Sequence, residues 1–285
     1  MLNKIINGNK IANLLKKKIK KRVIKILKKG NRPPGLAVIL VGNDNSSKIY
    51  VKKKKIACKK VGYIFKCWKL IKTIKESEIL KLIKKLNQDK TIDGILVQLP
   101  LPNHINTNNI LYSISYKKDV DGLHPYHAGR ILQNNPIIRS CAPKGIMTII
   151  EKYNIQTHGL NAVIIGSSNI VGRPMSMELL ASGCTITITN KYTKNLIYYT
   201  KHADILIVAI GKPNFINKSW IKNKAVIFDV GINKLLNGKI TGDVNLNSVY
   251  KKISYITPVP GGVGPMTVVS LLDNILIAYK KYHNN

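Results

Sequence analysis

Lys54 has the residue type and the position of a proton-transfer group. It lies in the segment YVKKKK, residues 50–55. Helical spacing places it on one stripe with Tyr50, Ala57 and Val61, which should face the interior. Burial and neighbouring like charges disfavour the ammonium form, and enzymes tune such lysines toward a pKa of roughly 7 to 8. The alternative is a side chain that passes the apolar stripe and ends in water.

Gln98 is the polar residue of the otherwise apolar segment ILVQLPLP, residues 95–102. If it is buried, its amide needs hydrogen-bond partners, which a lysine amine and a substrate carbonyl would supply. An edge strand that turns Gln98 to water is the alternative.

The segment KDVDG, residues 118–122, places Asp119 and Asp121 in a loop, where turn formation is the ordinary role of such residues. His124 and His127 follow, but no third ligand stands at a useful spacing. We therefore expect no metal site.

A glycine turn in the second half of the chain is suited to binding a phosphate. The strand VII, residues 163–165, runs into GSSNIVGRP, residues 166–174, and then into a helical pattern. Such a turn offers main-chain N–H groups and the positive end of a helix to a phosphate, as in dinucleotide folds. Ser168 replaces the second glycine of G-x-G-x-x-G, so the motif alone is weak. A nucleotide-free turn is the alternative.

The residues after the next strand favour NADP over NAD. That strand ends at Thr189 and is followed by Asn190 and Lys191, where NAD-binding chains often have a carboxylate. A carboxylate would repel a 2′-phosphate, whereas Lys191 and Arg173 would attract one.

A second dense turn precedes the last helical segment. Residues 258–267, PVPGGVGPMT, include three prolines and three glycines, which hold a loop closely against its surroundings. Thr267 is available to cap the following helix. A ligand wall and a rigid interdomain turn both explain such a loop.

Strand and helix patterns alternate along the chain and predict an α/β fold with mostly parallel sheets. The first expected helices cover 9–29, 47–61 and 76–87, and the first expected strands cover 36–41, 64–70 and 94–99. Residues 102–140 are expected to be loop-rich and to carry a domain boundary or a site. The later expected helices are 143–153, 174–180 and 267–282, and the later strands are 162–165, 185–189, 205–210, 225–230 and the region of Ile256.

The apolar content of the chain excludes a disordered protein, but its large positive net charge needs an explanation. The 285 residues are 45% apolar, which supplies a core for one large or two medium domains. With 47 basic and 13 acidic residues, the net charge of +34 would suit a nucleic acid or an anionic membrane. Only five basic residues are arginines, and the lysines are spread along the chain. We therefore favour drift toward A- and T-rich codons over a specific nucleic-acid partner.

The cysteines and the apolar runs indicate a cytoplasmic protein with no membrane partner. The four cysteines form no CxxC pair, and a chain of this size needs no disulfide to fold. No apolar run approaches the roughly 20 residues that span a bilayer.

Several long motifs, in a fixed order, make the chain resemble the bifunctional methylenetetrahydrofolate dehydrogenase/cyclohydrolases. The motifs are the 50–54 segment, VQLPLP, KDVDGLHP, CAPKG, GSSNIVGRP, VIFDVGIN and TPVPGGVGPMT. The resemblance implies a folate-binding catalytic domain, 1–138 with 266–285, and a Rossmann-type NADP-binding domain, 139–265, with a cleft between them. It also implies NADP-dependent oxidation of 5,10-methylenetetrahydrofolate and hydrolysis to 10-formyltetrahydrofolate, in the one-carbon metabolism that serves purine biosynthesis.

The resemblance further assigns site residues and a homodimer. Lys54 matches the catalytic lysine, Gln98 its partner, and Tyr50 the tyrosine that packs on the folate. Asp121 matches the residue that holds the pterin ring. Other positions matched to the folate site are Val97, Leu99, Pro260, Gly261, Gly262, Val263, Gly264 and Pro265. Positions matched to NADP are Gly166, Ser167, Ser168, Val171, Gly172, Arg173, Lys191 and Ile232. Relatives vary at Lys191, which leaves NAD as an alternative, and a dehydrogenase without the hydrolase step remains an alternative that turns on Lys54.

Overall fold

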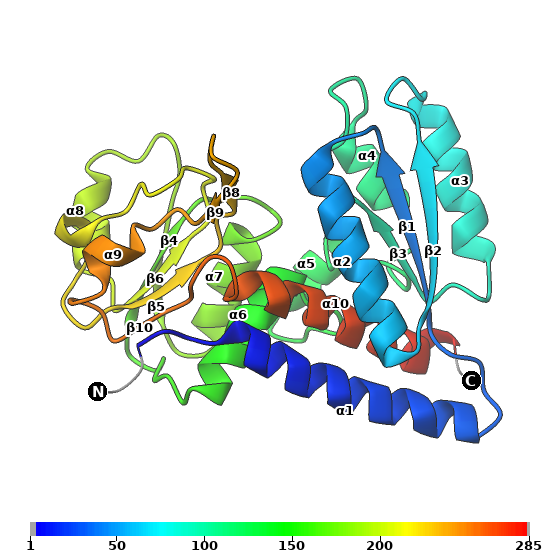
Figure 1. Ribbon diagram of the computed structural model, residues 1–285, viewed down its shortest axis with the longest axis horizontal. Coiled ribbons are helices and arrows are strands. Elements are labelled where there is room, and N and C mark those ends of the chain that lie inside the picture. Colours follow the sequence, from blue (N-terminus) through cyan, green and yellow to red (C-terminus); the bar gives the residue numbers. More distant parts are fainter. Residues whose placement is uncertain (1–3, 284–285) are drawn as a thin grey trace. The chain divides into compact units, whose positions relative to one another are not determined.

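The computed structural model describes residues 4–283, which form two compact α/β units (Figure 1). Unit 1 contains the residues up to Ala12 together with Ser140–Thr267, and unit 2 contains Asn13–Arg139 with the residues from Val268 onward. The boundaries at Ala12 and Thr267 fall inside two helices, α1 (Gly8–Lys28) and α10 (Val263–Ala278). Across residues 4–283, no helix combines the length and the apolar character needed to cross a membrane.

Unit 2 is built on a parallel sheet of three strands in the order β2-β1-β3. The central strand, β1 (Gly35–Val41), is buried along its whole length, as its unbroken apolar sequence predicts. It is flanked by β2 (Ile64–Leu70) and β3 (Gly94–Val97). The carboxyl ends of the three strands therefore lie at one edge of the sheet.

Helices cover both faces of this sheet. Every second residue of β1 from position 37 to 41 shares a core with α3 (Glu76–Gln88) and α4 (Thr107–Ser113). Side chains alternate along a strand, so the residues between them point to the opposite face. On β1 and β2 packs α2 (Asn45–Val61), and Figure 1 shows it lying along these strands.

Unit 1 is a parallel sheet of five strands in the order β10-β7-β6-β4-β5. Its strands are β4 (Asn161–Ile165), β5 (Thr185–Thr189), β6 (Ile205–Val208), β7 (Val226–Asp229) and β10 (Tyr255–Ile256). The strand order reverses at β4, which has β5 on one side and β6 on the other. Open parallel sheets bind ligands at the carboxyl ends of the strands beside such a reversal.

Short elements complete unit 1. They are the helices α6 (Cys141–Lys152), α7 (Gly172–Ala181), α8 (Leu196–Lys201) and α9 (Leu246–Val249), the 3₁₀ turn Lys218–Trp220, and the antiparallel hairpin of β8 (Asn233–Lys234) and β9 (Ile240–Thr241). The sequence patterns predicted α6 and α7 but not the other short elements.

The segment 102–140 is more ordered than expected, because it contains α4 and α5 (Pro125–Leu132). The side chain of Asn106 begins α4 by accepting hydrogen bonds from two main-chain N–H groups, and His124 Nδ1 begins α5 by accepting from Tyr126 N at 3.0 Å. Helices of seven and eight residues are too short for an apolar period to be read from the sequence.

Two predicted element ends are corrected by the structure. The last helix begins at Val263 and not at Thr267, whose hydroxyl lies inside the helix and donates to Val263 O at 3.2 Å. Pro265 is tolerated there because the first turn of a helix needs no N–H donor. The strand β3 ends at Val97, so Gln98 follows the strand directly.

Residues 4–12 lie in unit 1, whereas the sequence analysis groups them with the catalytic domain, residues 1–138. Ile6 N donates to Ile256 O at 2.8 Å, and Ile256 N donates to Lys4 O at 2.9 Å. This parallel pairing extends the sheet beyond β10 and binds the start of the chain to unit 1.

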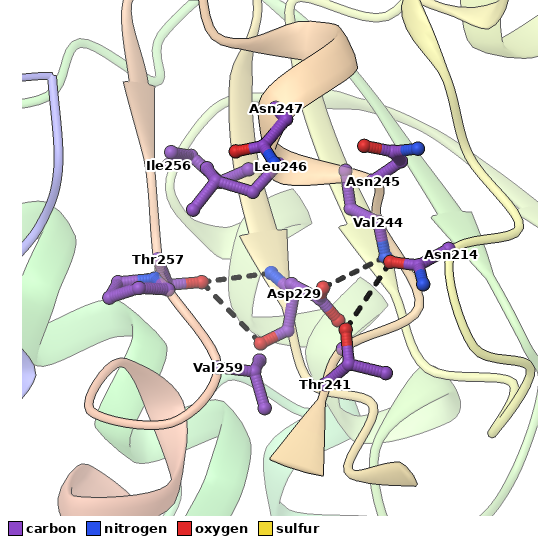
Figure 2. A pocket seen from close by; sticks show the side chains of 12 residues that line it. Asn214, Asp229, Thr241, Val244, Asn245, Leu246, Asn247, Ile256, Thr257 and Val259 are labelled. Atoms are coloured by element: carbon purple, nitrogen blue, oxygen red, sulfur yellow. Dashed lines mark hydrogen bonds between the residues drawn. The ribbon is translucent and has the colours of Figure 1, made fainter. Parts of the chain in front are cut away.

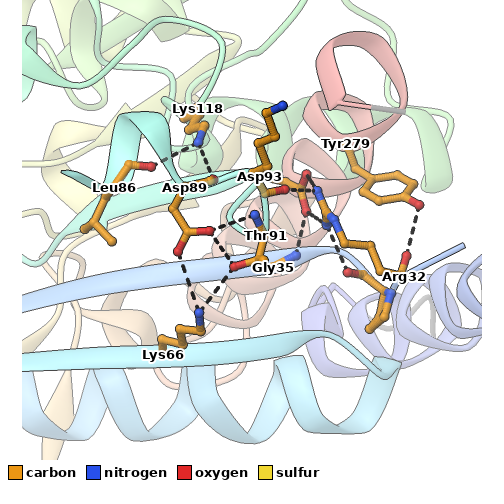
Figure 3. Close-up of polar contacts among 11 residues, drawn as sticks. Arg32, Gly35, Lys66, Leu86, Asp89, Thr91, Asp93, Lys118 and Tyr279 are labelled. Atoms are coloured by element: carbon orange, nitrogen blue, oxygen red, sulfur yellow. Dashed lines mark hydrogen bonds and ion pairs between the residues drawn. The ribbon is translucent and has the colours of Figure 1, made fainter. Parts of the chain in front are cut away.

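An ion pair between the half-buried Arg32 and the buried Asp93 holds the start of the unit 2 sheet (Figure 3). Asp93 is fully buried, and its two oxygens accept from the Arg32 guanidinium at 2.7 and 2.8 Å. Asp93 also accepts from the N–H of Gly35, the first residue of β1, at 2.7 Å. Tyr279 donates its hydroxyl to Arg32 O at 2.9 Å. The ion pair therefore joins the start of β1 to the turn before β3, and the Arg32 carbonyl adds a bond to Tyr279, directly after α10.

We expect Arg32→Ala to lower the free energy of unfolding by roughly 3 kcal/mol or more, because the Asp93 carboxylate would remain buried without its charged partner. Urea denaturation followed by circular dichroism measures this loss. Lys152→Ala is the matched control, since it breaks the exposed pair with Glu151 and should cost less than about 0.5 kcal/mol. Equal losses in the two variants would contradict the assigned role.

Candidate active site

Lys54 and Gln98 are hydrogen-bonded to each other in unit 2. Lys54 Nζ donates to Gln98 Oε1 at 2.9 Å. Two further bonds hold the glutamine, because its main-chain N donates to Ile39 O at 2.9 Å and its Nε2 donates to Leu99 O at 2.8 Å. The amide is thereby oriented with its oxygen toward the lysine. The structure brings these two predicted site residues together at the carboxyl end of β3.

Lys54 is half-buried, whereas the other lysines of the run 52–55 are exposed. It projects from the face of α2 that carries Val51 and Cys58, both of which are buried. Burial raises the pKa of the Cys58 thiol to about 12, so this neighbour is uncharged at neutral pH. The interior stripe predicted from the sequence is present, with Lys54 at its margin and less deeply buried than expected.

The ends of α2 are fixed, and with them the position of Lys54. Asp44 precedes the helix and accepts from Ser47 N at 2.7 Å. Hydrogen bonds from the Ser46 side chain and from Ser47 lower the pKa of Asp44 to about 2, so a negative charge faces the positive end of the helix. Gly62 ends the helix with φ at 86°, a conformation that favours glycine, and its N–H donates to Cys58 O.

Three other predicted folate-site residues of unit 2 are close in sequence to Lys54 or to Gln98. Tyr50 lies one helical turn before Lys54, is half-buried, and has its pKa raised by burial. Lys53 Nζ lies 5.7 Å from the centre of the Tyr50 ring. Val97 is buried at the end of β3, and Leu99 is half-buried. Tyr50 shares α2 with Lys54, Val97 ends β3 directly before Gln98, and Leu99 directly follows Gln98.

The two aspartates of the 118–122 loop have different surroundings. Asp119 is 3% exposed and accepts from His124 N at 2.7 Å and Gly122 N at 3.2 Å. Burial is the main cause that raises the pKa of Asp119 to about 7. Asp121 is half-buried and lies inside the loop that these bonds close. Asp119, which was not among the predicted site residues, therefore shapes the loop that presents Asp121.

Asn274 is a second support that sequence reasoning missed. It is fully buried in α10, and its Nδ2 donates to Val120 O at 2.9 Å and to Arg139 O at 2.8 Å. Gly94 allows the loop to approach β3, because a Cβ there would lie 2.7 Å from the Val120 side chain. The available signal was a polar pair, Asp273 and Asn274, in the second half of a largely apolar helix.

His124 and His127 are both bonded to the main chain. His124 Nδ1 accepts the N–H that begins α5, so the proton of the neutral ring is on Nε2. His127 is 2% exposed, and its Nε2 lies 2.8 Å from Tyr116 O, which can only accept. Burial lowers the pKa of His127 to about 4, and its Nδ1 has no hydrogen-bond partner within residues 4–283. Its ring is therefore neutral at physiological pH.

The glycine turn of unit 1 is packed too closely for larger residues at two positions. A Cβ at Gly172 would overlap Gly166 O, and a Cβ at Gly166 would overlap Ala209 O. Gly166 also has φ at 111°, which favours glycine. Ser168, at the place of the missing second glycine, is exposed and its Oγ accepts from Val171 N at 3.2 Å. It supports the start of α7.

Two exposed cations lie at the same edge of the unit 1 sheet. Arg173 belongs to the first turn of α7, after β4, and its Nε donates to Ser167 O at 3.2 Å. Lys191 follows β5, whose last residue pairs with the last residue of β4. Because both side chains are exposed, each can reach an anion at the carboxyl ends of these strands.

Ile232 and the 260–265 turn lie side by side in unit 1. Ile232 is 44% exposed, and a Cβ at Gly264 would lie 3.8 Å from its Cδ1. The turn is held against the beginning of α1, where Asn9 N donates to Gly261 O at 3.2 Å. A Cβ at Gly8 would overlap Gly262 O, which shows how closely the two segments approach. Residues predicted to contact the dinucleotide and the folate are therefore neighbours in this unit.

A pocket of about 380 Å³ opens beside the end of β7 (Figure 2). Polar side chains dominate its lining, among them Asp229, Asn214, Thr241 and Thr257. Figure 2 shows Thr257 bonded to the main chain of Asp229, and the N–H of Asp229 donates to Thr257 Oγ1 at 2.8 Å. None of the predicted site residues lines this pocket.

Comparison with known proteins identifies two family models in the chain. One, described as the tetrahydrofolate dehydrogenase/cyclohydrolase catalytic domain, matches residues 6–121. The other, described as the tetrahydrofolate dehydrogenase/cyclohydrolase NAD(P)-binding domain, matches residues 140–283.

Three of the solved structures that are similar to this chain are described as methylenetetrahydrofolate dehydrogenases, and two of these descriptions also name the cyclohydrolase. The bifunctional FolD methylenetetrahydrofolate dehydrogenase/cyclohydrolase of Campylobacter jejuni is 44% identical, with 97% of this chain and 98% of that chain covered and a TM-score of 0.94. A 5,10-methylenetetrahydrofolate dehydrogenase of the silkworm Bombyx mori is 37% identical, with all of both chains covered and a TM-score of 0.93. The Trypanosoma brucei dehydrogenase-cyclohydrolase, in complex with NADP and an inhibitor, is 30% identical, with 99% and 98% covered and a TM-score of 0.94.

The buried His127 predicts a pH dependence of stability. The pKa of His127 is about 4 in the folded chain and 6.5 in the unfolded chain. Between pH 4 and 6.5 the ring is therefore protonated in the unfolded chain but neutral in the folded chain, so lowering the pH favours unfolding. As pH falls from about 6.5 to 4, the wild type should lose about 3 kcal/mol more unfolding free energy than His127→Gln. Urea titrations across this range measure the difference. The surface variant His158→Gln should follow the wild type, and parallel curves for His127→Gln and the wild type would refute the assignment.

Proposed function

Because the chain belongs to the tetrahydrofolate dehydrogenase/cyclohydrolase family, we propose that it oxidises 5,10-methylenetetrahydrofolate with NADP and hydrolyses the product to 10-formyltetrahydrofolate. The observation that carries the proposal is the 2.9 Å hydrogen bond from Lys54 Nζ to Gln98 Oε1 at the carboxyl end of β3. It joins the two side chains whose chemistry suits the hydrolytic step.

The residues of unit 1 fit a phosphorylated dinucleotide. The close approach of Gly172 to Gly166 leaves a main-chain cradle at the start of α7, and Arg173 and Lys191 add positive charge at the same sheet edge. We propose that Gly166, Ser167, Ser168, Val171, Gly172, Arg173, Lys191 and Ile232 hold NADP. When bound, NADP supplies the acceptor for the hydride that leaves the methylene bridge of the substrate.

We propose that unit 2 aligns the folate for both steps. Asp121 would hold the pterin ring, while Tyr50, Val97 and Leu99 would contact it through apolar surface. Residues 260–265 are proposed to contribute further folate contacts. The cation left by hydride loss is stabilised by the folate's own nitrogens, so alignment is the main contribution of these side chains to the oxidation.

Lys54 would act in the hydrolysis. Water adds to the methenyl carbon and must lose a proton before the ring opens to the 10-formyl product. A neutral Lys54 amine can accept that proton, and Gln98 keeps the amine at one place by accepting one of its N–H groups. Lys54 is half-buried, and its neighbours Val51 and Cys58 on the same face of α2 are buried.

We also propose a cytoplasmic homodimer that supplies one-carbon units for purine biosynthesis. All four cysteines are free thiols, which suits a reducing compartment. Light scattering of the purified protein at several concentrations measures the oligomeric state. A mass of one chain, 31.8 kDa, at every concentration would exclude the dimer.

Lys54→Met should reduce the cyclohydrolase rate by roughly 10²- to 10⁴-fold while the folate still binds, because the substitution keeps the length of the side chain and removes its basic nitrogen. Methenyl-folate absorbance reports hydrolysis, and reduced-nicotinamide absorbance reports oxidation on the same sample. Lys52→Met, at an exposed position of the same helix, is the control and should retain both rates. Normal hydrolysis in Lys54→Met would remove this lysine from the mechanism.

Lys191→Ala should raise the KM for NADP by roughly tenfold and leave the KM for NAD unchanged, because only NADP carries the 2′-phosphate that this cation would bind. Initial dehydrogenase rates of the wild type and the variant with each nucleotide measure both constants. A wild type that prefers NAD, or a variant with equal changes for both nucleotides, would contradict the NADP assignment.

A further inference from the structure

Among the buried carboxylates of unit 1, Asp229 and Asp243 lie close together and take no part in the chemistry proposed above. Asp229 at the end of β7 is 3% exposed, and Asp243 after β9 is fully buried. Removing charged groups from water is costly unless they are hydrogen-bonded in the folded protein. Burial, together with the nearby Asp243 carboxylate, raises the pKa of Asp229 to about 7. The burial of two neighbouring acidic side chains therefore calls for a structural or functional explanation.

The Asp229 carboxylate packs against the main chain beside Asp243, and the Asp243 carboxylate packs against the main chain near Asp229. A Cβ at Gly242 would overlap the Asp229 carboxylate, and a Cβ at Gly231 would overlap the Asp243 carboxylate. Asp229 also accepts from Asp243 N at 3.0 Å and from Val244 N at 2.9 Å. The segments 229–233 and 242–244 are thereby locked to each other by reciprocal Asp–Gly contacts.

The same two carboxylates hold the residues on either side of Ile232. Gly231 N donates to Asp229 Oδ1 at 3.1 Å, and Asn233 Nδ2 donates to Asp243 Oδ1 at 2.8 Å. Ile232 itself remains 44% exposed. The main chain is therefore fixed immediately before and after a side chain that is open to a ligand.

The second oxygen of Asp243 is bonded to the segment that packs against the glycine turn of unit 1, residues 166–174, which we call the phosphate turn. Asp243 Oδ2 accepts from Ile210 N at 2.8 Å and from Gly211 N at 3.0 Å. The preceding residue, Ala209, has its carbonyl in close approach to Gly166, where no Cβ would fit. One carboxylate thus links the Ile232 loop with the main chain that supports the Gly166 turn.

We propose that Asp229 and Asp243 are positioning residues for the dehydrogenase reaction, which hold Ile232 and the phosphate turn at the spacing that the dinucleotide requires. This inference rests on the proposed function, because it takes Ile232 and the turn as parts of the dinucleotide site. It assigns the pair no role in hydrolysis, which needs no hydride acceptor.

The test is a double-mutant cycle on Asn233 and Ile232, because Asn233→Ala removes one bond to Asp243 without leaving a new buried charge. Titration with NADP, followed by protein fluorescence, gives the dissociation constant. Asn233→Ala should raise it by roughly fivefold, the effect of one hydrogen bond. In a chain that already carries Ile232→Ala, the same substitution should change it by less than about twofold.

Both activities of each variant separate positioning from general destabilisation. Asn233→Ala should raise the KM for NADP while its cyclohydrolase rate stays within about twofold of the wild type. The control is Asn237→Ala in the same β8–β9 hairpin, at an exposed position, and it should bind NADP as the wild type does. Asp243→Asn, if it folds, should show a larger rise in the NADP dissociation constant than Asn233→Ala.

Three results would overturn the inference: an unchanged NADP affinity in Asn233→Ala, an equal effect with and without Ile232, or a parallel loss of both activities. Wild-type protein that turns over no methylenetetrahydrofolate with either nucleotide would instead refute the proposed function. The two failures are therefore distinguishable.

Discussion

The hydrogen bond between Lys54 and Gln98 requires a fixed distance between α2, which carries Lys54, and the end of β3, which Gln98 follows. The core of unit 2 holds these two elements in place. Gln98 is bonded through its main chain to β1, which is buried along its whole length. The buried side chains of Val51 and Cys58 lie on the face of α2 that carries Lys54, and α2 packs on β1 and β2. A displacement of about 1 Å at a reacting group can cost roughly 100-fold in rate. The geometry of this polar pair therefore rests on the apolar core beneath it.

Unit 1 uses a different construction, in which main-chain segments approach one another without side chains between them. Glycines at 166, 172, 231 and 242 occupy positions where a Cβ would overlap a carbonyl or a carboxylate. They bring no reactive group, yet the loops that carry Arg173 and Ile232 depend on them. Hydrogen bonds from main-chain N–H groups to Asp229 and Asp243 complete this arrangement. Such a surface is rigid because its spacing is set by backbone atoms.

Much of this architecture could be predicted from local patterns, while the tertiary supports could not. The apolar run of β1 and the helical stripe of α2 predicted both elements and singled out Lys54 from its lysine neighbours. The helices α4 and α5 escaped prediction because their starts depend on side-chain caps at Asn106 and His124 and their lengths give no clear period.

The remaining supports arise from contacts between residues far apart in the chain. Asn274 reaches Val120, and the carboxylate of Asp243 reaches Ile210. In the sequence nothing next to Asn274 or Asp243 indicates which distant main-chain group either side chain contacts. The motif likeness identified the family and its expected site residues, but it carried no information on which buried groups hold those residues in place.

The pairing of residues 4–6 with Ile256 has a consequence for biosynthesis. During synthesis on a ribosome, residues 4–6 are made long before Ile256, with which they pair. This segment therefore stays unpaired until translation has passed Ile256. Because the pairing joins residues that are far apart in the sequence, it is a non-local contact, and such contacts form late in folding.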